Sequence, residues 1–208
     1  MPDTAMTAPR AATVRARHAA SLLVLQGDGP APALLMGMRG AGHRFMPNKL
    51  VFPGGSVDRP DATAQVAKAM PAHVQAMLEK SCKPRLAHAL GIAAARELEE
   101  ETGLTLGNPP DLSGFDYLGR AITPPGGPVR FNARFFVVDS TAITGELAGS
   151  GELEGLRYYP MEEALALDLA RPTRVIIGLL QRWLEMTPAE RDARTQTPVM
   201  RQRKLVME

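Results

Sequence analysis

The stretch that decides the fold is RELEEETG, residues 96–103. It holds four acids within five positions, Glu97, Glu99, Glu100 and Glu101, and it ends on a glycine. On a helix, Glu97, Glu100 and Glu101 stand at i, i+3 and i+4 and share one face, whereas Glu99 points away. Like charges at i, i+4 destabilise a helix by roughly 0.2–0.5 kcal/mol per pair, and the negative end of the helix dipole adds to this. The acidic face is therefore unfavourable without cations.

Two interpretations of this face follow from its spacing. Mg²⁺ and Mn²⁺ prefer carboxylate oxygens and complete their coordination with water and substrate phosphates, so the face can be a metal site. Alternatively, it is a solvated acidic surface whose repulsion is relieved by Arg96 or by a distant basic residue. The spacing alone leaves both interpretations open.

Composition limits the classes of protein to consider. The 208 residues, 45% of them hydrophobic, suffice for one domain with a sizeable core. A net charge of +2 gives no reason to expect a nucleic-acid or membrane partner, and the longest apolar runs, 19–25 and 175–180, are far short of the ~20 residues that span a bilayer. The single cysteine, Cys82, excludes an intramolecular disulfide and fits a reducing, cytoplasmic compartment.

Strand and helix patterns alternate along the chain. Hydrophobic runs bounded by turn residues predict strands at 13–25, 33–39, 49–52, 117–123, 133–140 and 155–160, the first two as a hairpin. Helical periodicity predicts two short helices within 61–81, a longer helix at 84–102, and others at 161–167 and 173–186. This interleaving indicates an α/β fold with a mixed sheet over residues 13–186. In the tail, 187–208, only a capping-box spacing at 187–190 carries a structural signal.

Residues 50–58, LVFPGGSVD, and 94–104, AARELEEETGL, together resemble the Nudix hydrolase family. The box of that family reads G, five residues, E, seven residues, then R-E-U-x-E-E-x-G-U, where U is a bulky aliphatic residue. Residues 96–104 match its second half at every specified position, and Gly55 matches the opening glycine.

The first half of the box departs from the family pattern. Gly55 and Arg96 are 41 positions apart where the standard box has 14, so 27 residues are inserted, at about 59–85. Counting back from Arg96 places His88 where the first box glutamate is expected, although a histidine on an apolar helix is more often packed and hydrogen-bonded than a ligand. An insertion at this place is similar to a subgroup that includes coenzyme A diphosphatases.

The resemblance implies a fold and an activity. The fold is a mixed β-sheet sandwiched between α-helices, in α/β/α layers. The activity is hydrolysis, with Mg²⁺ or Mn²⁺, of the diphosphate linkage in a nucleoside diphosphate joined to another group, such as coenzyme A or an acyl-coenzyme A. ADP-ribose or a dinucleotide is the alternative substrate, and nucleotide sensing without cleavage is the alternative function. The expected partner is this small molecule, with neither nucleic acid nor membrane, and a homodimer is one expectation because many family members dimerise.

The same resemblance assigns roles to the residues of the box. Glu97, Glu100 and Glu101 become the metal ligands, with Glu97 either a ligand or the group that orients or deprotonates the attacking water. Arg96 braces the loop or the glutamates. Gly54 and Gly55 allow the backbone a close turn beside the helix, for which an ordinary turn is the alternative explanation.

Several residues outside the box are candidates for the same site. Glu152 precedes an aromatic strand and is either a further metal ligand or general base, or an ordinary surface acid. Arginine suits bidentate phosphate recognition, and Arg39 and Arg44 are favoured because they flank the glycine loop. Arg130 and Arg134 are weaker candidates for the same role.

Overall fold

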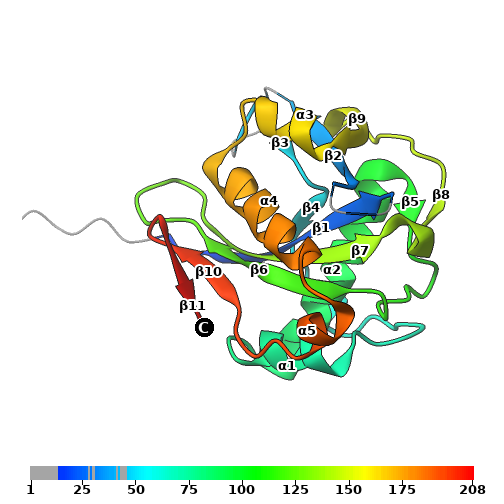
Figure 1. The fold of residues 1–208 in the computed structure, drawn as a ribbon, viewed down its shortest axis with the longest axis vertical. Coiled ribbons are helices and arrows are strands. Elements are labelled where there is room, and N and C mark those ends of the chain that lie inside the picture. Colours follow the sequence, from blue (N-terminus) through cyan, green and yellow to red (C-terminus); the bar gives the residue numbers. More distant parts are fainter. Residues whose placement is uncertain (1–13, 28, 30, 41, 43–45) are drawn as a thin grey trace, which may run out of the picture.

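The structure, a computed structural model, describes residues 14–27, 29, 31–40, 42 and 46–208. Within these residues, nine strands form one mixed sheet in the order β11-β10-β6-β7-β1-β2-β3, with β4 also pairing with β1 and β9 with β2 (Figure 1). The strands are β1 (Arg17–Gln26), β2 (Ala33–Arg39), β3 (Leu50–Val51), β4 (Gly54–Ser56), β6 (Asp116–Ile122), β7 (Phe131–Asp139), β9 (Leu153–Pro160), β10 (Pro198–Arg201) and β11 (Lys204–Met207).

Helices cover both faces of this sheet (Figure 1). They are α1 (Ala72–Glu79), α2 (Pro84–Thr102), α3 (Met161–Ala166), α4 (Arg171–Leu184) and α5 (Pro188–Asp192), with 3-10 turns η1 (Pro60–Ala62) and η2 (Ser140–Ala142). A separate short pair is formed by β5 (Leu104–Thr105) and β8 (Thr144–Gly145). The expected α/β/α arrangement around a mixed sheet is therefore confirmed.

Strand β1 is the centre of the molecule. It runs parallel to β7 along nearly its whole length and antiparallel to β4 and β2 on its other side. Alternate side chains enter different cores: Leu22 and Val24 pack towards α1 and α2, whereas Leu23 and Leu25 pack towards α3 and α4. Burial on both faces explains why the sequence of this strand is continuously apolar.

Helix α2 has the expected bounds. Proline occupies its first turn, where the missing N–H costs nothing, and Gly103 ends it in the left-handed conformation at φ 72°. The Gly103 N–H donates to the carbonyl of Glu99 at 2.9 Å. Leu90 and Leu98 pack against the sheet, which leaves the acidic face turned towards β4.

The two helices expected within 61–81 are wrong in part. Only α1 and the short turn η1 form, and residues 63–71 between them have no helix. The Ala67 N–H donates to the Pro110 carbonyl at 2.9 Å, and the Leu112 N–H donates to the Lys68 carbonyl at 3.0 Å. These long-range backbone bonds outweigh the helical periodicity of the segment.

The hairpin of β1 and β2 is present but pairs only near its turn, at Leu25 with Leu34 and Gln26 with Ala33. Beyond that point the same edge of β2 pairs with β3, and β9 pairs along the other edge of β2 over its whole length. The sequence could not reveal this arrangement, because β9 lies far away along the chain.

The tail folds onto the same sheet. Thr187 and Glu190 form the capping box of α5, as their spacing predicted. Strand β10 then pairs in parallel with β6, and β11 follows antiparallel as the edge strand. Across the described residues, no helix combines the length and apolar character needed to cross a membrane.

Candidate active site

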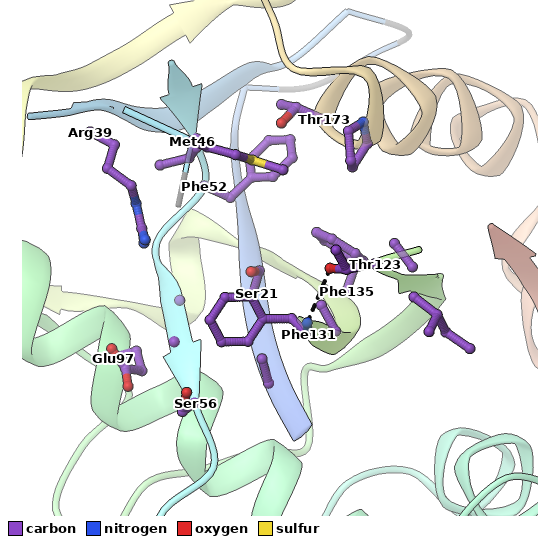
Figure 2. A pocket seen from close by; sticks show the side chains of 18 of the residues that line it. Ser21, Arg39, Met46, Phe52, Ser56, Glu97, Thr123, Phe131, Phe135 and Thr173 are labelled. Atoms are coloured by element: carbon purple, nitrogen blue, oxygen red, sulfur yellow. Dashed lines mark hydrogen bonds between the residues drawn. The ribbon is translucent and has the colours of Figure 1, made fainter. Parts of the chain in front are cut away.

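A cavity of about 610 Å³ lies beside the C-terminal half of α2. One end is lined by charged side chains from α2 and the loops around it: Arg39, Asp58, Arg96, Glu97, Glu100 and Glu152. Apolar side chains from β6, β7, β10 and the segment before β4 line the rest. Figure 2 shows Arg39 and Glu97 at one end, with Phe135 and Thr123 away from them. The cavity is therefore amphipathic along its length.

The glycine loop lies directly against the acidic face of α2. The Gly54 N–H donates to Glu101 Oε2 at 2.7 Å. Gly54 has φ 151°, and a Cβ there would lie 2.4 Å from the Ala20 carbonyl oxygen. A Cβ on Gly55 would lie 2.4 Å from the carboxylate of Glu97. Glycine suits both positions, because the backbone of β1 occupies the space beside Gly54 and the carboxylate of Glu97 occupies the space beside Gly55.

Arg96 joins the helix to this loop. Its Nη1 donates to Glu97 Oε1 and to Glu100 Oε2, each at 2.9 Å, while Nη2 donates to the Ser56 carbonyl at 3.0 Å. A guanidinium group is planar and carries several N–H donors, so it can bind two carboxylates at the same time. Its position agrees with a bracing role and places the guanidinium between two of the expected ligands.

Asp61 completes this network, and the sequence interpretation missed it. The side chain is only 2% exposed and accepts from Arg96 Nε at 3.1 Å and from the Asp58 N–H at 2.7 Å. Counted forward from Gly55, Asp61 follows after five residues, which is the spacing of the first acid of the box. That forward count was the available signal.

Placing His88 at this position was therefore wrong, because the count back from Arg96 crosses the insertion. Nε2 of His88 lies 2.9 Å from the Ala64 carbonyl oxygen instead, and it makes no contact with Arg96. The insertion thus falls between Asp61 and Arg96.

Burial is the main influence on the pKa values of the glutamates on α2. Burial, together with the charges of Glu97 and Glu152, raises the pKa of Glu101 to about 7, although the Gly54 N–H and Arg39 act in the opposite direction. Nη2 of Arg39 lies 4.0 Å from Glu101 Oε1, a distance too long for a hydrogen bond. Burial also raises the pKa of Glu97. A cation among these carboxylates would relieve both effects.

These side chains fit a divalent metal by chemistry, although they are not gathered around one point. Among the described residues, no group of three or more histidine, cysteine or acidic side chains is arranged as a ready metal site. Arg96 holds Glu97 and Glu100, and the Gly54 N–H holds Glu101. The donors are all carboxylate oxygens, which suit Mg²⁺ or Mn²⁺, and the raised pKa values of Glu97 and Glu101 mark a site that a cation would stabilise.

The other candidate residues divide between the cavity and elsewhere. Glu152, exposed just before β9, and Arg39 both line the charged end. Nε of Arg39 is buried and has no hydrogen-bond partner among the residues that the structure describes. Arg44 lies outside the described residues. Arg130 donates to the carbonyls of Thr123 and Val14 and does not line the cavity.

Arg134 lies on the opposite face of the sheet. Phe131, Ala133 and Phe135 line the cavity, and the alternation of strand β7 turns Arg134 the other way. It is completely buried there, with Nη1 2.9 Å from Nδ1 of His18 and donating to the Asn132 carbonyl at 3.1 Å.

Comparison with known proteins agrees with this geometry. Residues 88–179 match the family model of the NUDIX domain. A NUDIX hydrolase from Alicyclobacillus acidocaldarius has a similar structure, with a TM-score of 0.62 and 24% identity over 80% of this chain and 91% of that one. A MutT NUDIX hydrolase from Burkholderia pseudomallei gives a TM-score of 0.53 and 18% identity over 80% of this chain and 99% of that one.

A third similar structure is the NUDIX domain of Shewanella oneidensis NrtR complexed with ADP ribose, with a TM-score of 0.52 and 15% identity over 86% of this chain and 95% of that one. No curated protein matches the chain. These comparisons show that the chain has the fold of Nudix structures and that residues 88–179 match the NUDIX domain model.

Proposed function

We propose that the protein hydrolyses the diphosphate linkage of a nucleoside diphosphate joined to another group, with Mg²⁺ or Mn²⁺ as cofactor. One observation carries this proposal: the Gly54–Gly55 backbone packs on the carboxylates of α2, with the Gly54 N–H bonded to Glu101, at the charged end of the cavity. Phosphoryl transfer needs charge neutralisation and positioning more than covalent catalysis, and this end of the cavity offers groups for both.

Glu97, Glu100 and Glu101 are the proposed metal ligands, with Glu152 as a further candidate. A bound divalent ion there would neutralise the diphosphate and lower the pKa of a bound water. The chain itself supplies orientation, because the Gly54 N–H fixes Glu101 and Arg96 fixes the other two α2 carboxylates. Glu97 or Glu152 is the candidate general base, since both line the cavity.

Arg39 is the proposed contact for a substrate phosphate. Its guanidinium lines the charged end, and its buried Nε has no hydrogen-bond partner within the described part of the chain. A phosphate oxygen would satisfy that donor and add the bidentate geometry that arginine favours. Gly54 and Gly55 would let the diphosphate approach the backbone closely, because neither carries a side chain.

Two substrate classes are supported by different observations. The insertion between Asp61 and Arg96 resembles that of coenzyme A diphosphatases and supports coenzyme A or an acyl-coenzyme A. The likeness to the NrtR domain, which was solved with ADP ribose, supports ADP-ribose or a related dinucleotide. Binding without cleavage is the alternative function, and the complete set of box carboxylates argues against it.

The test is product release from coenzyme A, acetyl-coenzyme A, ADP-ribose, NADH and diadenosine polyphosphates, each with Mg²⁺, with Mn²⁺ and with chelator. Glu100→Gln and Glu101→Gln are each expected to reduce turnover by at least ~100-fold, because metal-based charge stabilisation is lost. Glu99→Gln is the matched control, since Glu99 is exposed and does not line the cavity. Near-normal turnover in both site variants would contradict the assignment, and binding without cleavage under every metal condition would favour the sensing alternative.

A further inference from the structure

The C-terminal hairpin, formed by β10 and β11, is part of the cavity wall. Strand β10 lies beside β6 (Figure 1), and residues 199–201 pair in parallel with 120–122. Met200 lines the cavity. The two backbones approach closely, since a Cβ on Gly119 would lie 2.8 Å from the Pro198 carbonyl oxygen. The hairpin thus supplies a side chain to the site and does more than extend the sheet.

Two side-chain contacts hold the hairpin in this place. Nη1 of Arg120 in β6 donates to Glu208 Oε2 at 2.8 Å. Within the hairpin, Thr197 and Glu208 exchange two backbone hydrogen bonds of 2.9 and 3.0 Å. On its other side, Nη2 of Arg171 donates to the Arg203 carbonyl at 2.9 Å. Arg171 begins α4, whose next two residues line the cavity. The hairpin is therefore fixed to both β6 and α4, the two elements that border this end.

The lining of this end is aromatic and apolar. Phe131 and Ile122 line the cavity and are partly exposed, whereas Phe52, Phe135 and Met200 are at most 8% exposed. Figure 2 shows the side chains of Phe52, Phe131 and Phe135. The charged lining side chains, among the residues that the structure describes, come from β2, α2 and the loops after β4 and before β9, at the other end. Such a surface favours a flat, uncharged ring, which gains from stacking and from leaving water.

We infer that the C-terminal hairpin makes this end of the cavity a pocket for a nucleobase, with Met200 and Phe131 as specificity-determining side chains. The inference rests on the proposed function for the orientation of the ligand, since the diphosphate would then lie at the glutamate end. A cavity of about 610 Å³ can hold both parts of such a ligand. Recognition of the ring itself needs neither metal nor diphosphate.

That independence gives a direct test, calorimetric titration of adenosine into the full-length protein with chelator present. Met200→Ala and Phe131→Leu are each expected to weaken adenosine binding by about tenfold or more, in line with the loss of a stacking contact. Met200→Leu, which keeps an apolar chain of similar size, is expected to stay within about threefold of wild type. Met207→Ala is the matched control, because Met207 belongs to the same hairpin, is 54% exposed and does not line the cavity.

Thermal unfolding of each variant separates lost binding from lost folding. If hydrolysis is found, Met200→Ala should also raise KM for the preferred substrate more than it lowers kcat, because the ring contact is made equally in ground and transition states. If wild type and the variants bind adenosine as expected but no substrate is cleaved, the proposed function is refuted and the nucleobase pocket is supported. Cleavage without adenosine binding, or equal losses in Met207→Ala and Met200→Ala, would overturn the pocket.

Discussion

At the scale of single residues, the candidate site depends on one buried acid, Asp61, which is not among the residues that line the cavity. Asp61 fixes Arg96, and Arg96 in turn fixes Glu97 and Glu100. The pair of Asp61 and Arg96 is largely buried, with side-chain exposures of 3% and 25%. A change at Asp61 should therefore affect both stability and the positions of two glutamates.

We expect Asp61→Asn to lower the free energy of unfolding by about 1–3 kcal/mol, since it removes a charged hydrogen-bond partner from Arg96. Turnover should fall by about tenfold or more, with a smaller change in KM. Urea unfolding and steady-state kinetics measure the two effects. His88→Gln is the comparison, because the alternative count along the chain gave His88 this position, and it should change turnover less than threefold. Equal losses in the two variants would contradict the role of Asp61.

The raised pKa of Glu101 predicts a pH dependence of the metal-free protein. The pKa of about 7 in the folded protein exceeds the usual 4.5, so the protonated form is favoured by folding. Its contribution to stability is complete below the unfolded pKa and is lost as pH rises through about 7. With chelator, wild type should lose about 2–3 kcal/mol relative to Glu101→Gln between pH 5 and pH 8.

Added Mg²⁺ should remove most of that difference at pH 8, because the cation stabilises the ionised carboxylate. The measurement is urea unfolding of both proteins at each pH, with chelator and with Mg²⁺. Parallel stability curves for the two proteins under chelation would show that Glu101 titrates normally.

At the scale of elements, a helix or strand was predicted correctly where the residues that determine it lie within the element itself. Helix α2 was predicted with its bounds, because Pro84, Gly103 and the apolar periodicity all lie within the element. The structure of residues 63–71 was not predicted, because their backbone forms hydrogen bonds with residues 110–112. The strands of the tail were not predicted either. Strand β11 is exposed along its whole length, so its sequence shows no alternation of buried and exposed residues.

The residues of the candidate site divide in the same way. The acidic face and the glycines form motifs within short segments, so the sequence was enough to find them. The contact of Asp61 with Arg96 and the position of Phe131 and Phe135 in the cavity wall became visible only in the folded structure. In β7 the alternation of Phe131, Ala133 and Phe135 was visible in the sequence, but nothing local indicates which face of the strand borders a cavity.

The contact between β4 and α2 can be tested at Gly55. Gly55→Ala places a Cβ 2.4 Å from the Glu97 carboxylate, so either the loop or the glutamate must move. We expect turnover to fall by about 100-fold, since small displacements of positioned groups are costly in catalysis. Gly127→Ala is the control, because its Cβ would meet nothing closer than 3.6 Å. Unchanged kinetics in Gly55→Ala would show that the loop adapts without cost.

At the scale of the whole molecule, the tail and the central sheet form one structure. Val199 and Met200 of β10 are buried at 0% and 8% exposure, and β10 covers the edge of β6. Removal of the tail would expose that edge together with the apolar surface beneath it. An uncovered sheet edge also favours association between chains.

We expect a chain truncated after residue 186 to unfold at least ~5 °C lower than the full chain, and to aggregate on heating. Differential scanning calorimetry with light scattering measures both. Leu205→Ser and Val206→Ser test the exposed side of the hairpin, since these side chains are 44% and 43% exposed, and each should change the midpoint by less than ~2 °C. A truncated chain as stable as wild type would mean that β10 packs without contributing to the fold.

The contact between Asp61 and Arg96 also closes a loop, because the 34 residues between them leave and return at one ion pair. The entropy of closing a loop grows only with the logarithm of its length, so extending this connection from seven residues to 34 costs about 1.4 kcal/mol. The ion pair therefore fixes the acidic face of α2 where the inserted residues return to the site. Within the insertion, α1 and the first turns of α2 belong to the core, so a longer regulatory segment would have to enter at the turn between the two helices, residues 80–83.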